Sequence, residues 1–172
     1  MIDLSAGRIA EAAGGRLVAG DPERAGPERA VIDTRALEPG DLFVGLRGAS
    51  ADGGRFAAQA LDAGAWGVLV SPEHRSAAAE AAEASTGQAA CANATAIVAD
   101  DPLAALQRLA NAWRRELGAR VAGITGSTGK TSTKDILAAL LGSRARTHAS
   151  RENFNTEIGL PLTVLEAGRP TE

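Results

Sequence analysis

Short apolar runs and segments with helical spacing alternate along this chain. Continuous apolar runs bounded by turn residues are typical of buried strands. Four such runs are present, at residues 29–33, 42–46, 66–70 and 95–99. Apolar residues at helical intervals predict helices over residues 6–13, 56–63, 77–84 and 102–117. Residues 88–94 are predicted to form a loop. Strands that alternate with helices predict an α/β fold.

One predicted helix is especially well marked at both ends. It starts at Asp101-Pro102, where Asp is a favoured N-cap and Pro a favoured first helical residue. Its apolar stripe, which we interpret as core packing, ends before Gly118. A strand-like run, residues 121–125, begins just beyond. We therefore place a domain boundary here, with residues 1–118 forming one α/β domain and residues 119–172 beginning a second.

A glycine-rich turn, Gly126-Ser-Thr-Gly-Lys-Thr131, follows that strand-like run and precedes a predicted helix over residues 132–141. A phosphate-binding loop requires this strand–loop–helix context. We expect Lys130 to contact the β- and γ-phosphates of ATP and the Thr131 hydroxyl to bind Mg²⁺. The helix N-terminus would add its dipole and its unpaired N–H groups. The backbone cradle for the phosphates is predicted to consist of Gly126, Ser127, Thr128 and Gly129.

The turn is a close variant of the general phosphate-loop pattern, G-x-x-x-x-G-K-[ST]. That pattern places a glycine five residues before Gly129, where this chain has Ile124. The alternative is a Gly-rich turn between a strand and a helix with no ligand. Lysine usage favours a phosphate site, because Lys130 and Lys134 are the only lysines in the sequence, against sixteen arginines. We expect Lys134, one turn further along the helix, to be solvated.

Composition excludes several other classes of protein. A net charge of −3 over 172 residues gives no basic surface for nucleic acid or anionic lipid. Cys91 is the only cysteine, so the sequence contains no disulfide framework. No apolar run is long enough to cross a bilayer, and the N-terminus lacks the pattern of a signal peptide. We therefore expect a cytoplasmic monomer that binds neither nucleic acid nor membranes.

A first group of candidate binding residues lies after the strand predicted at residues 29–33. Thr34 and Arg35 place a hydroxyl and a guanidinium at the end of this strand. These groups are suited to hold a ribose, a uracil or a phosphate, the guanidinium by a bidentate contact. The alternative is an ordinary strand end with a surface arginine.

A second group lies near the end of the sequence. Asn153, Asn155 and Glu157 place two amides and one carboxylate in a short loop. They are candidates to bind a phosphate or a substrate carboxylate, with Glu157 near a metal. The alternative is a helix-capping loop, in which Asn155 is the N-cap of a short helix through Leu165.

Together these segments resemble the Mur ligases, a family of ATP-dependent ligases of cell-wall synthesis. The matching stretches span most of the chain and are Asp33-Thr-Arg35, Pro39-Gly-Asp-Leu-Phe-Val44, Gly64-Ala-Trp-Gly-Val-Leu-Val70, residues 123–134 and residues 153–161. The family's loop is typically G-T-x-G-K-T/S, which accounts for the displaced glycine. Lys134-Asp135 and the Asn-Phe-Asn-x-Glu-Ile-Gly run favour the branch that adds D-alanyl-D-alanine over the sister branch that adds the third amino acid.

The resemblance implies both a fold and a reaction. The implied fold is a small α/β domain that binds a UDP-linked substrate, followed by the start of a P-loop-type central ATPase domain. In the implied reaction, ATP phosphorylates the terminal carboxylate of UDP-N-acetylmuramoyl-tripeptide. The amine of D-alanyl-D-alanine then attacks the acyl phosphate, and Mg²⁺ assists as the metal ion.

The resemblance also implies roles for individual residues. Lys130 matches the catalytic lysine on the phosphates, and Thr131 matches the Mg²⁺ ligand. Thr34 and Arg35 match the motif that holds UDP. The loop beside the reacting phosphates is matched by Asn153, Asn155 and Glu157.

The chain departs from the family pattern in three ways. Family members often carry a histidine after Asp52-Gly53, where this chain has Gly54; if that histidine contacts uridine, the contact is lost or replaced, with Arg55 as a candidate. Thr156 stands where a third asparagine is common. Family members are also much longer, so we expect this chain to be an N-terminal fragment that does not ligate alone. The alternatives are the sister branch, a cyanophycin-type amide ligase and a non-catalytic nucleotide-binding module.

Overall fold

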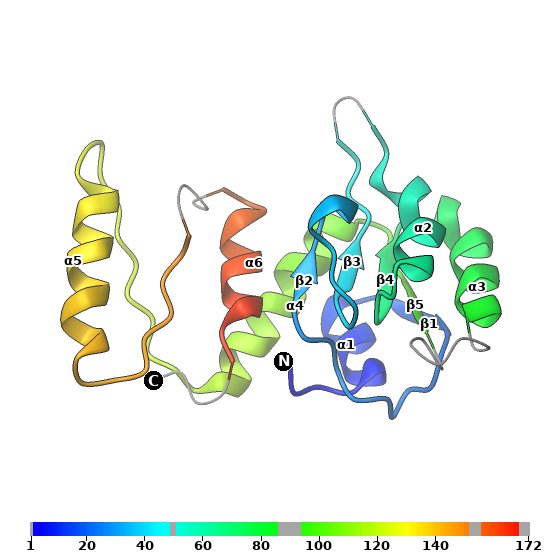
Figure 1. Ribbon diagram of the computed structural model, residues 1–172, viewed down its shortest axis with the longest axis horizontal. Helices are drawn as coiled ribbons and strands as arrows, with labels where there is room; N and C mark the ends of the chain where they lie inside the picture. Colours follow the sequence, from blue (N-terminus) through cyan, green and yellow to red (C-terminus); the bar gives the residue numbers. More distant parts are fainter. Residues whose placement is uncertain (1, 49–50, 86–93, 152–155, 169–172) are drawn as a thin grey trace.

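The computed structural model describes residues 2–48, 51–85, 94–151 and 156–168. These residues form a mixed α/β fold around one five-stranded sheet, with strand order β1-β5-β4-β3-β2 (Figure 1). The strands are β1 (Arg16–Ala19), β2 (Ala30–Val31), β3 (Leu42–Val44), β4 (Gly67–Val70) and β5 (Thr95–Val98). Strands β2 to β5 are parallel, and β1 joins β5 as an antiparallel edge strand. The α/β fold and the four strands predicted between residues 29 and 99 are thus confirmed, whereas no sequence pattern predicted β1.

Helices cover both faces of the sheet, because successive side chains of a strand point to opposite sides. On one face, Leu42, Leu69 and Ile97 pack against α1 (Ala6–Ala13) and α4 (Pro102–Leu117). On the other face, Phe43 and Val68 pack against α2 (Ala57–Asp62) and α3 (Arg75–Ala84). Burial on both faces explains why these strands read as continuous apolar runs.

Helix α4 has the boundaries that its capping residues predict. The Asp101 carboxylate accepts hydrogen bonds from the backbone N–H groups of Leu103, at 2.9 Å, and Ala104, at 3.1 Å. The stripe interpreted as core packing is buried, including Leu106, Leu109 and Trp113. Asp101 therefore satisfies two of the N–H groups that the first helical turn leaves unpaired.

The chain then extends away from the sheet and returns. Helix α5 (Lys130–Gly142) lies to one side, and α6 (Gly159–Glu166) lies between α5 and the sheet (Figure 1). Leu162 and Leu165 of α6 join the same core cluster as α1 and α4. The indole N–H of Trp113 donates to the carbonyl of Ala167, at 2.8 Å, and so ties the end of α6 to α4.

The strand expected over residues 121–125 is wrong for this structure. These residues are extended but pair with no strand in the part of the chain that the structure describes, and Val121 is 66% exposed. A strand needs a neighbour for its N–H and C=O groups, and no described strand lies beside this segment. The loop expected over residues 88–94 falls almost wholly outside the described residues. Among the described helices, none is long and apolar enough to cross a membrane.

Candidate functional site

One candidate site lies at the edge of the sheet where the parallel strands end. Ligands of open α/β sheets bind outside the carboxyl ends of the strands. Three connections meet at this edge: η1 (Thr34–Ala36) after β2, residues 45–48 after β3, and η3 (Pro72–His74) after β4. Figure 1 shows η1 and the connection after β3 on this same side of the sheet.

Thr34 and Arg35 occupy the short helix η1 at this edge. Asp33 caps it by accepting from the Arg35 N–H, and its carboxylate also holds the Arg35 guanidinium, with a closest distance of 2.6 Å. This hydrogen bond from Arg35 lowers the pKa of Asp33 to about 2. The Arg35 side chain is nevertheless 88% exposed, so its guanidinium remains accessible to a ligand.

An ion pair between Arg29 and Asp41 holds η1 in place. The Asp41 carboxylate is buried and accepts two hydrogen bonds from Arg29 Nε, each 3.1 Å long, and one from the Glu38 N–H, 2.8 Å long. Arg29 in turn donates to the carbonyl of Ala36, the last residue of η1, at 3.0 Å. The hydrogen bond from Arg29 to Asp41 raises the pKa of the guanidinium. No local sequence pattern predicts this support, because Arg29 and Asp41 are brought together by the pairing of β2 with β3.

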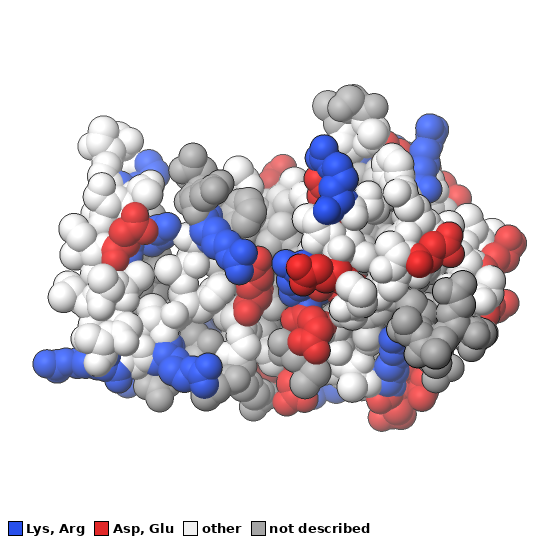
Figure 2. Space-filling model, viewed as in Figure 1, with Lys and Arg blue, Asp and Glu red and all other residues white. Residues whose placement is uncertain are grey.

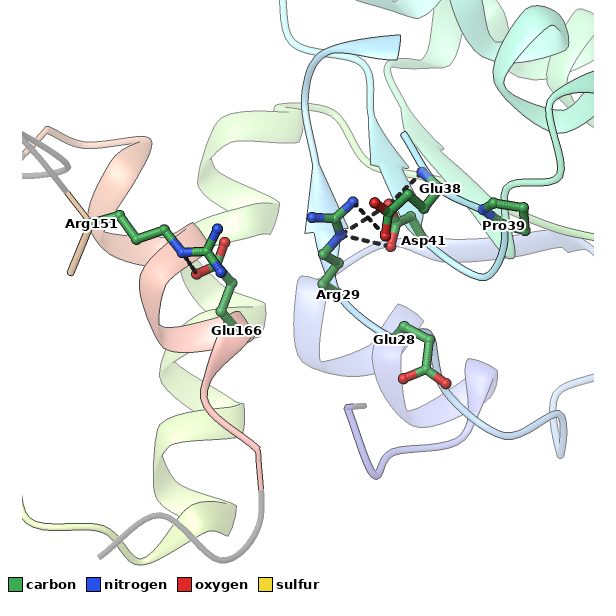
Figure 3. Close-up of a pocket in the computed structure, with 7 residues that line it drawn as sticks. All are labelled: Glu28, Arg29, Glu38, Pro39, Asp41, Arg151 and Glu166. Carbon is green, nitrogen blue, oxygen red and sulfur yellow. Dashed lines mark hydrogen bonds and ion pairs between the residues drawn. The ribbon is translucent and has the colours of Figure 1, made fainter. Parts of the chain in front are cut away.

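The same ion pair forms one wall of a charged cleft between β2, β3 and α6. Figure 3 shows Arg29, Glu38 and Asp41 facing Arg151 and Glu166 across this cleft, which has a volume of about 360 Å³. Arg151 lies 3.5 Å from Glu166. In Figure 2, charged side chains of both signs lie together in the middle of the same face. The lining holds four carboxylates (Glu28, Glu38, Asp41 and Glu166) and two guanidinium groups (Arg29 and Arg151), so its formal net charge is −2, which disfavours an anionic ligand in this cleft.

A third group of side chains at the carboxyl edge was not anticipated as a unit. His74 Nε2 lies 2.9 Å from the Asp52 carboxylate, and Arg47 lies 2.5 Å from Glu73. The hydrogen bond from His74 lowers the pKa of Asp52. The two pairs connect the loop after β3 to the loop after β4. No sequence motif links them, because Asp52 and His74 are brought together only by the pairing of their strands.

The predicted phosphate loop has the local geometry of a tight turn into a helix. Gly126 and Gly129 adopt φ values of 148° and 77°, and Gly129 is the N-cap of α5. Side chains other than glycine rarely adopt such φ values, so the turn requires glycine at both positions. Lys130 Nζ donates to the Gly126 carbonyl, at 2.5 Å, and folds the lysine back over the turn. No side chain caps the α5 N-terminus.

Helix α5 begins at Lys130 and confirms the helix predicted after the loop. Thr131 is exposed in its first turn. The expectation that Lys134 is solvated is wrong: its side chain is only 21% exposed, and its ammonium group donates to the Ser150 carbonyl, at 2.8 Å. Lys134 reaches back to the segment that follows α5 and so has a structural contact.

The residues expected beside the phosphates are described only in part. Asn153 and Asn155 lie outside the described residues, and so does the expected capping role of Asn155. Glu157 has an exposed side chain, and its backbone carbonyl accepts from the Gln107 side chain of α4, at 3.1 Å. Helix α6 begins at Gly159, with Ile158 at the N-cap position. Gln107 therefore attaches this loop to α4.

The structure does not bring all the candidate residues into one site. The phosphate loop lies at the upper end of α5, the carboxyl edge of the sheet lies on the same upper side, and α6 separates them (Figure 1). A groove of about 750 Å³ runs between α5, α6 and residues 117–124. The exposed face of α5 is apolar, with Ile136 61% and Leu140 65% exposed, and it is mostly uncharged in Figure 2.

Two family sequence models match this chain. One is described as "Mur ligase family, catalytic domain" and matches residues 30–114. The other is described as "Mur ligase middle domain" and matches residues 124–172. The gap between the two matches contains the end of α4 and the first part of the extended segment.

Curated relatives match over the whole chain. A UDP-N-acetylmuramoyl-tripeptide–D-alanyl-D-alanine ligase of Bacillus subtilis is 42% identical over 178 residues, which cover 100% of this chain and 35% of the relative. The enzyme of the same name from Mycobacterium leprae is 42% identical, with 100% and 36% coverage. The chain thus spans about a third of the length of these relatives.

Solved structures of the same kind resemble the fold. A crystal structure of MurF from Acinetobacter baumannii matches with a TM-score of 0.74 and 28% identity, covering 96% of this chain and 33% of that one. A MurF ligase from Thermotoga maritima in complex with ADP matches with a TM-score of 0.60 and 30% identity, covering 84% and 30%. Sequence models, curated relatives and solved structures agree, and the chain belongs to the Mur ligase family.

Proposed function

We propose that this chain supplies two parts of a ligase that joins D-alanyl-D-alanine to UDP-N-acetylmuramoyl-tripeptide. Residues 1–118 form the domain that binds the UDP-linked substrate, and residues 119–172 begin the ATP-binding domain. One observation carries the proposal: relatives named for this reaction match the whole chain, including both the phosphate loop and the carboxyl edge of the sheet.

The phosphate loop has the chemistry that ATP binding requires. The N–H groups of the first turn of α5 have no capping side chain, and the helix dipole favours an anion at this end. In the proposed complex, Lys130 leaves the Gly126 carbonyl and places its charge on the β- and γ-phosphates, where it neutralises charge that develops during transfer. Gly126, Ser127, Thr128 and Gly129 supply the backbone cradle.

Mg²⁺ fits this loop as a partial site. A hard cation takes oxygen ligands, and the exposed Thr131 hydroxyl stands directly after Lys130. Thr131 would hold the ion together with phosphate oxygens, and the ion would supply charge neutralisation at the phosphates. Glu157 is the carboxylate that the sequence predicts beside the phosphates, and Asn153 and Asn155, predicted with it, lie outside the described residues.

The carboxyl edge of the sheet has the chemistry that a UDP group requires. The exposed Arg35 guanidinium suits a diphosphate, and the Thr34 hydroxyl suits a phosphate or ribose oxygen. Both sit on η1, which Arg29 and Asp41 hold in place. The role of this edge is to anchor the substrate, while the reacting carboxylate lies at the far end of the tripeptide.

Binding experiments on the 172-residue chain test the proposal. UDP-N-acetylmuramoyl-tripeptide should bind by calorimetry, and Thr34→Ala and Arg35→Ala should each weaken the binding. The matched control is Arg16→Ala, which removes an exposed arginine from β1 at the opposite edge of the sheet. If the wild-type chain does not bind this substrate, the assignment of residues 1–118 is overturned.

A second experiment tests the phosphate loop. ADP and ATP should bind in the presence of Mg²⁺, and Lys130→Ala should weaken ATP more than ADP because the lysine contacts the γ-phosphate. Lys134→Ala is the matched control, since it removes the other lysine of the same helix. Equal ATP affinity in Lys130→Ala and wild type would remove Lys130 from its role. The chain alone should show no ligation of D-alanyl-D-alanine, and measurable ligation would contradict this part of the proposal.

A further inference from the structure

The imidazole ring of His74 lies directly against the backbone of Gly54. A Cβ atom at position 54 would lie 2.1 Å from His74 Cδ2 and 2.7 Å from Nε2. Real Cβ atoms essentially never approach other atoms this closely. Any side chain at position 54 would therefore clash with the His74 ring in its present position. The glycine at this position, which departs from the family pattern, is what lets the ring lie here.

Asp52 holds the ring in one orientation. Its carboxylate accepts from the Gly54 N–H, at 3.0 Å, and lies 2.9 Å from His74 Nε2. An ionised carboxylate only accepts hydrogen bonds, so Nε2 carries the proton in this pair. The neutral ring then presents Nδ1 as an acceptor. Among the described residues, the hydrogen bond and ion pairs of the ring are made by Nε2 and none is made by Nδ1, and the His74 side chain is 16% exposed.

The ring lies at the carboxyl edge of the sheet. Asp52 lies in the loop after β3, where it forms an isolated bridge with Arg47, and His74 ends η3 after β4. Strand β3 lies next to β2, so the loop that carries Asp52 follows the strand that neighbours β2, and β2 leads into η1 with Thr34 and Arg35. The Asp52–His74 pair thus lies at the same edge of the sheet as the proposed UDP-binding residues.

We infer that His74 is a ligand-contacting residue of this edge, and that its ring accepts a hydrogen bond at Nδ1 from the nucleoside half of the UDP-linked substrate. The inference rests on the proposed function, because it takes the UDP group as the ligand of this edge. Uridine has suitable donors in the imide N–H of its base and the hydroxyls of its ribose. Position 54 determines this contact, since only glycine there leaves space for the ring.

Calorimetric titration with UDP tests the inference. His74→Ala should weaken UDP binding about five- to tenfold, the usual effect of one hydrogen bond. His148→Ala is the matched control, because it removes the only other histidine and lies away from this edge, near Glu166. Equal affinity of wild type and His74→Ala overturns the inference but leaves the proposed function standing. Failure of wild type to bind UDP or the UDP-linked tripeptide overturns both.

A double-mutant cycle tests the link between the two positions. Gly54→Ala alone should weaken UDP binding, because the new methyl group displaces the ring. In the His74→Ala background the same change should have little further effect, since no ring remains to be displaced. Additive losses would show that position 54 acts independently of His74 and would overturn the coupling. Thermal unfolding of each variant distinguishes loss of the contact from loss of the fold.

Three analogues identify the donor. N3-methyl-UDP should lose affinity for wild type, but not for His74→Ala, if the imide N–H is the donor. 2′-Deoxy-UDP should show the same behaviour if the ribose 2′-hydroxyl is the donor. 3′-Deoxy-UDP tests the 3′-hydroxyl in the same way, and if all three analogues bind wild type as tightly as UDP does, Nδ1 accepts from none of these groups and the inference is overturned.

Discussion

Replacing Trp113 tests whether α6 is held by the same core that α1 and α4 form. Trp113 is fully buried on α4, and its indole N–H donates to the carbonyl of Ala167 just beyond α6. Leu162 and Leu165 of α6 pack in the same cluster. Through Gln107, the same helix α4 also holds the carbonyl of Glu157 at the start of this region. Loss of the indole should therefore loosen the segment that carries the candidate phosphate-side residues.

The structure sets the size of the effect. Trp113→Phe keeps most of the apolar volume but leaves the buried Ala167 carbonyl without this donor, which costs about 1–3 kcal/mol. Trp113→Ala also opens a cavity in the core and should cost about 3–5 kcal/mol. Urea unfolding followed by far-UV circular dichroism measures both changes in the free energy of unfolding.

Trp66→Phe is the matched control. Trp66 is also buried, and its indole N–H donates to the Ala25 carbonyl, at 2.6 Å, so its replacement removes the same kind of hydrogen bond without removing the one that holds the end of α6. Hydrogen exchange of the α6 amides should accelerate more in Trp113→Phe than in Trp66→Phe at equal global stability. Equal α6 exchange in the two variants, or a loss below about 1 kcal/mol in Trp113→Ala, would refute the reasoning.

Three further predictions follow from the contacts described above. Asp101→Ala should lower the free energy of unfolding by about 1 kcal/mol, because it removes the α4 cap, and Asp101→Asn should retain most of it in urea unfolding. Asp41→Ala should cost about 2–4 kcal/mol and weaken UDP binding, because Arg29 loses the partner that holds it against η1; an effect below that of Asp101→Ala would contradict this role. The folded pKa of Asp33, about 2, lies below its ordinary value of 3.8, so the stabilisation from Arg35 is present above about pH 4 and lost as the pH falls through 2. A midpoint near 3.8 for the Asp33 carboxyl carbon in an NMR titration would contradict that pairing.

Features encoded by neighbouring residues were predictable from the sequence. The four parallel strands are buried on both faces, so each appears as an uninterrupted apolar run. The two ends of helix α4 are determined by local residues, Asp101-Pro102 at its start and Gly118 at its end. Strand β1 was missed because it is a four-residue edge strand that is exposed at Arg16 and only partly buried elsewhere. Its pairing with β5 joins segments about 80 residues apart, and no local pattern marks such a partner.

The candidate site likewise has some features that the sequence predicts and others that only the structure shows. The sequence shows the residues suited to bind ligands, because they stand in short motifs. These are Gly126 to Thr131 for a phosphate, and Thr34 and Arg35 for a UDP group. The ion pairs that hold these residues in place cannot be predicted from such motifs. Arg29 contacts Asp41, and Asp52 contacts His74, only because their strands pair in the sheet. The departure at Gly54 is the instructive case. The sequence shows only a missing side chain at this position, whereas the structure places the ring of His74, twenty positions later, in that space.

The extended segment before the phosphate loop shows why one element of a motif can fail while the others form. The turn depends on two glycines and the helix on its own i to i−4 hydrogen bonds, so both are local and both form. A strand satisfies its N–H and C=O groups only across to another strand. Residues 121–125 have the apolar composition of a buried strand, yet Val121 is 66% exposed and no described strand lies beside it. Ile136 and Leu140 of α5 are likewise 61% and 65% exposed. The ATP affinity of Lys130→Ala against wild type measures whether the turn and α5 bind phosphate without a paired strand before them.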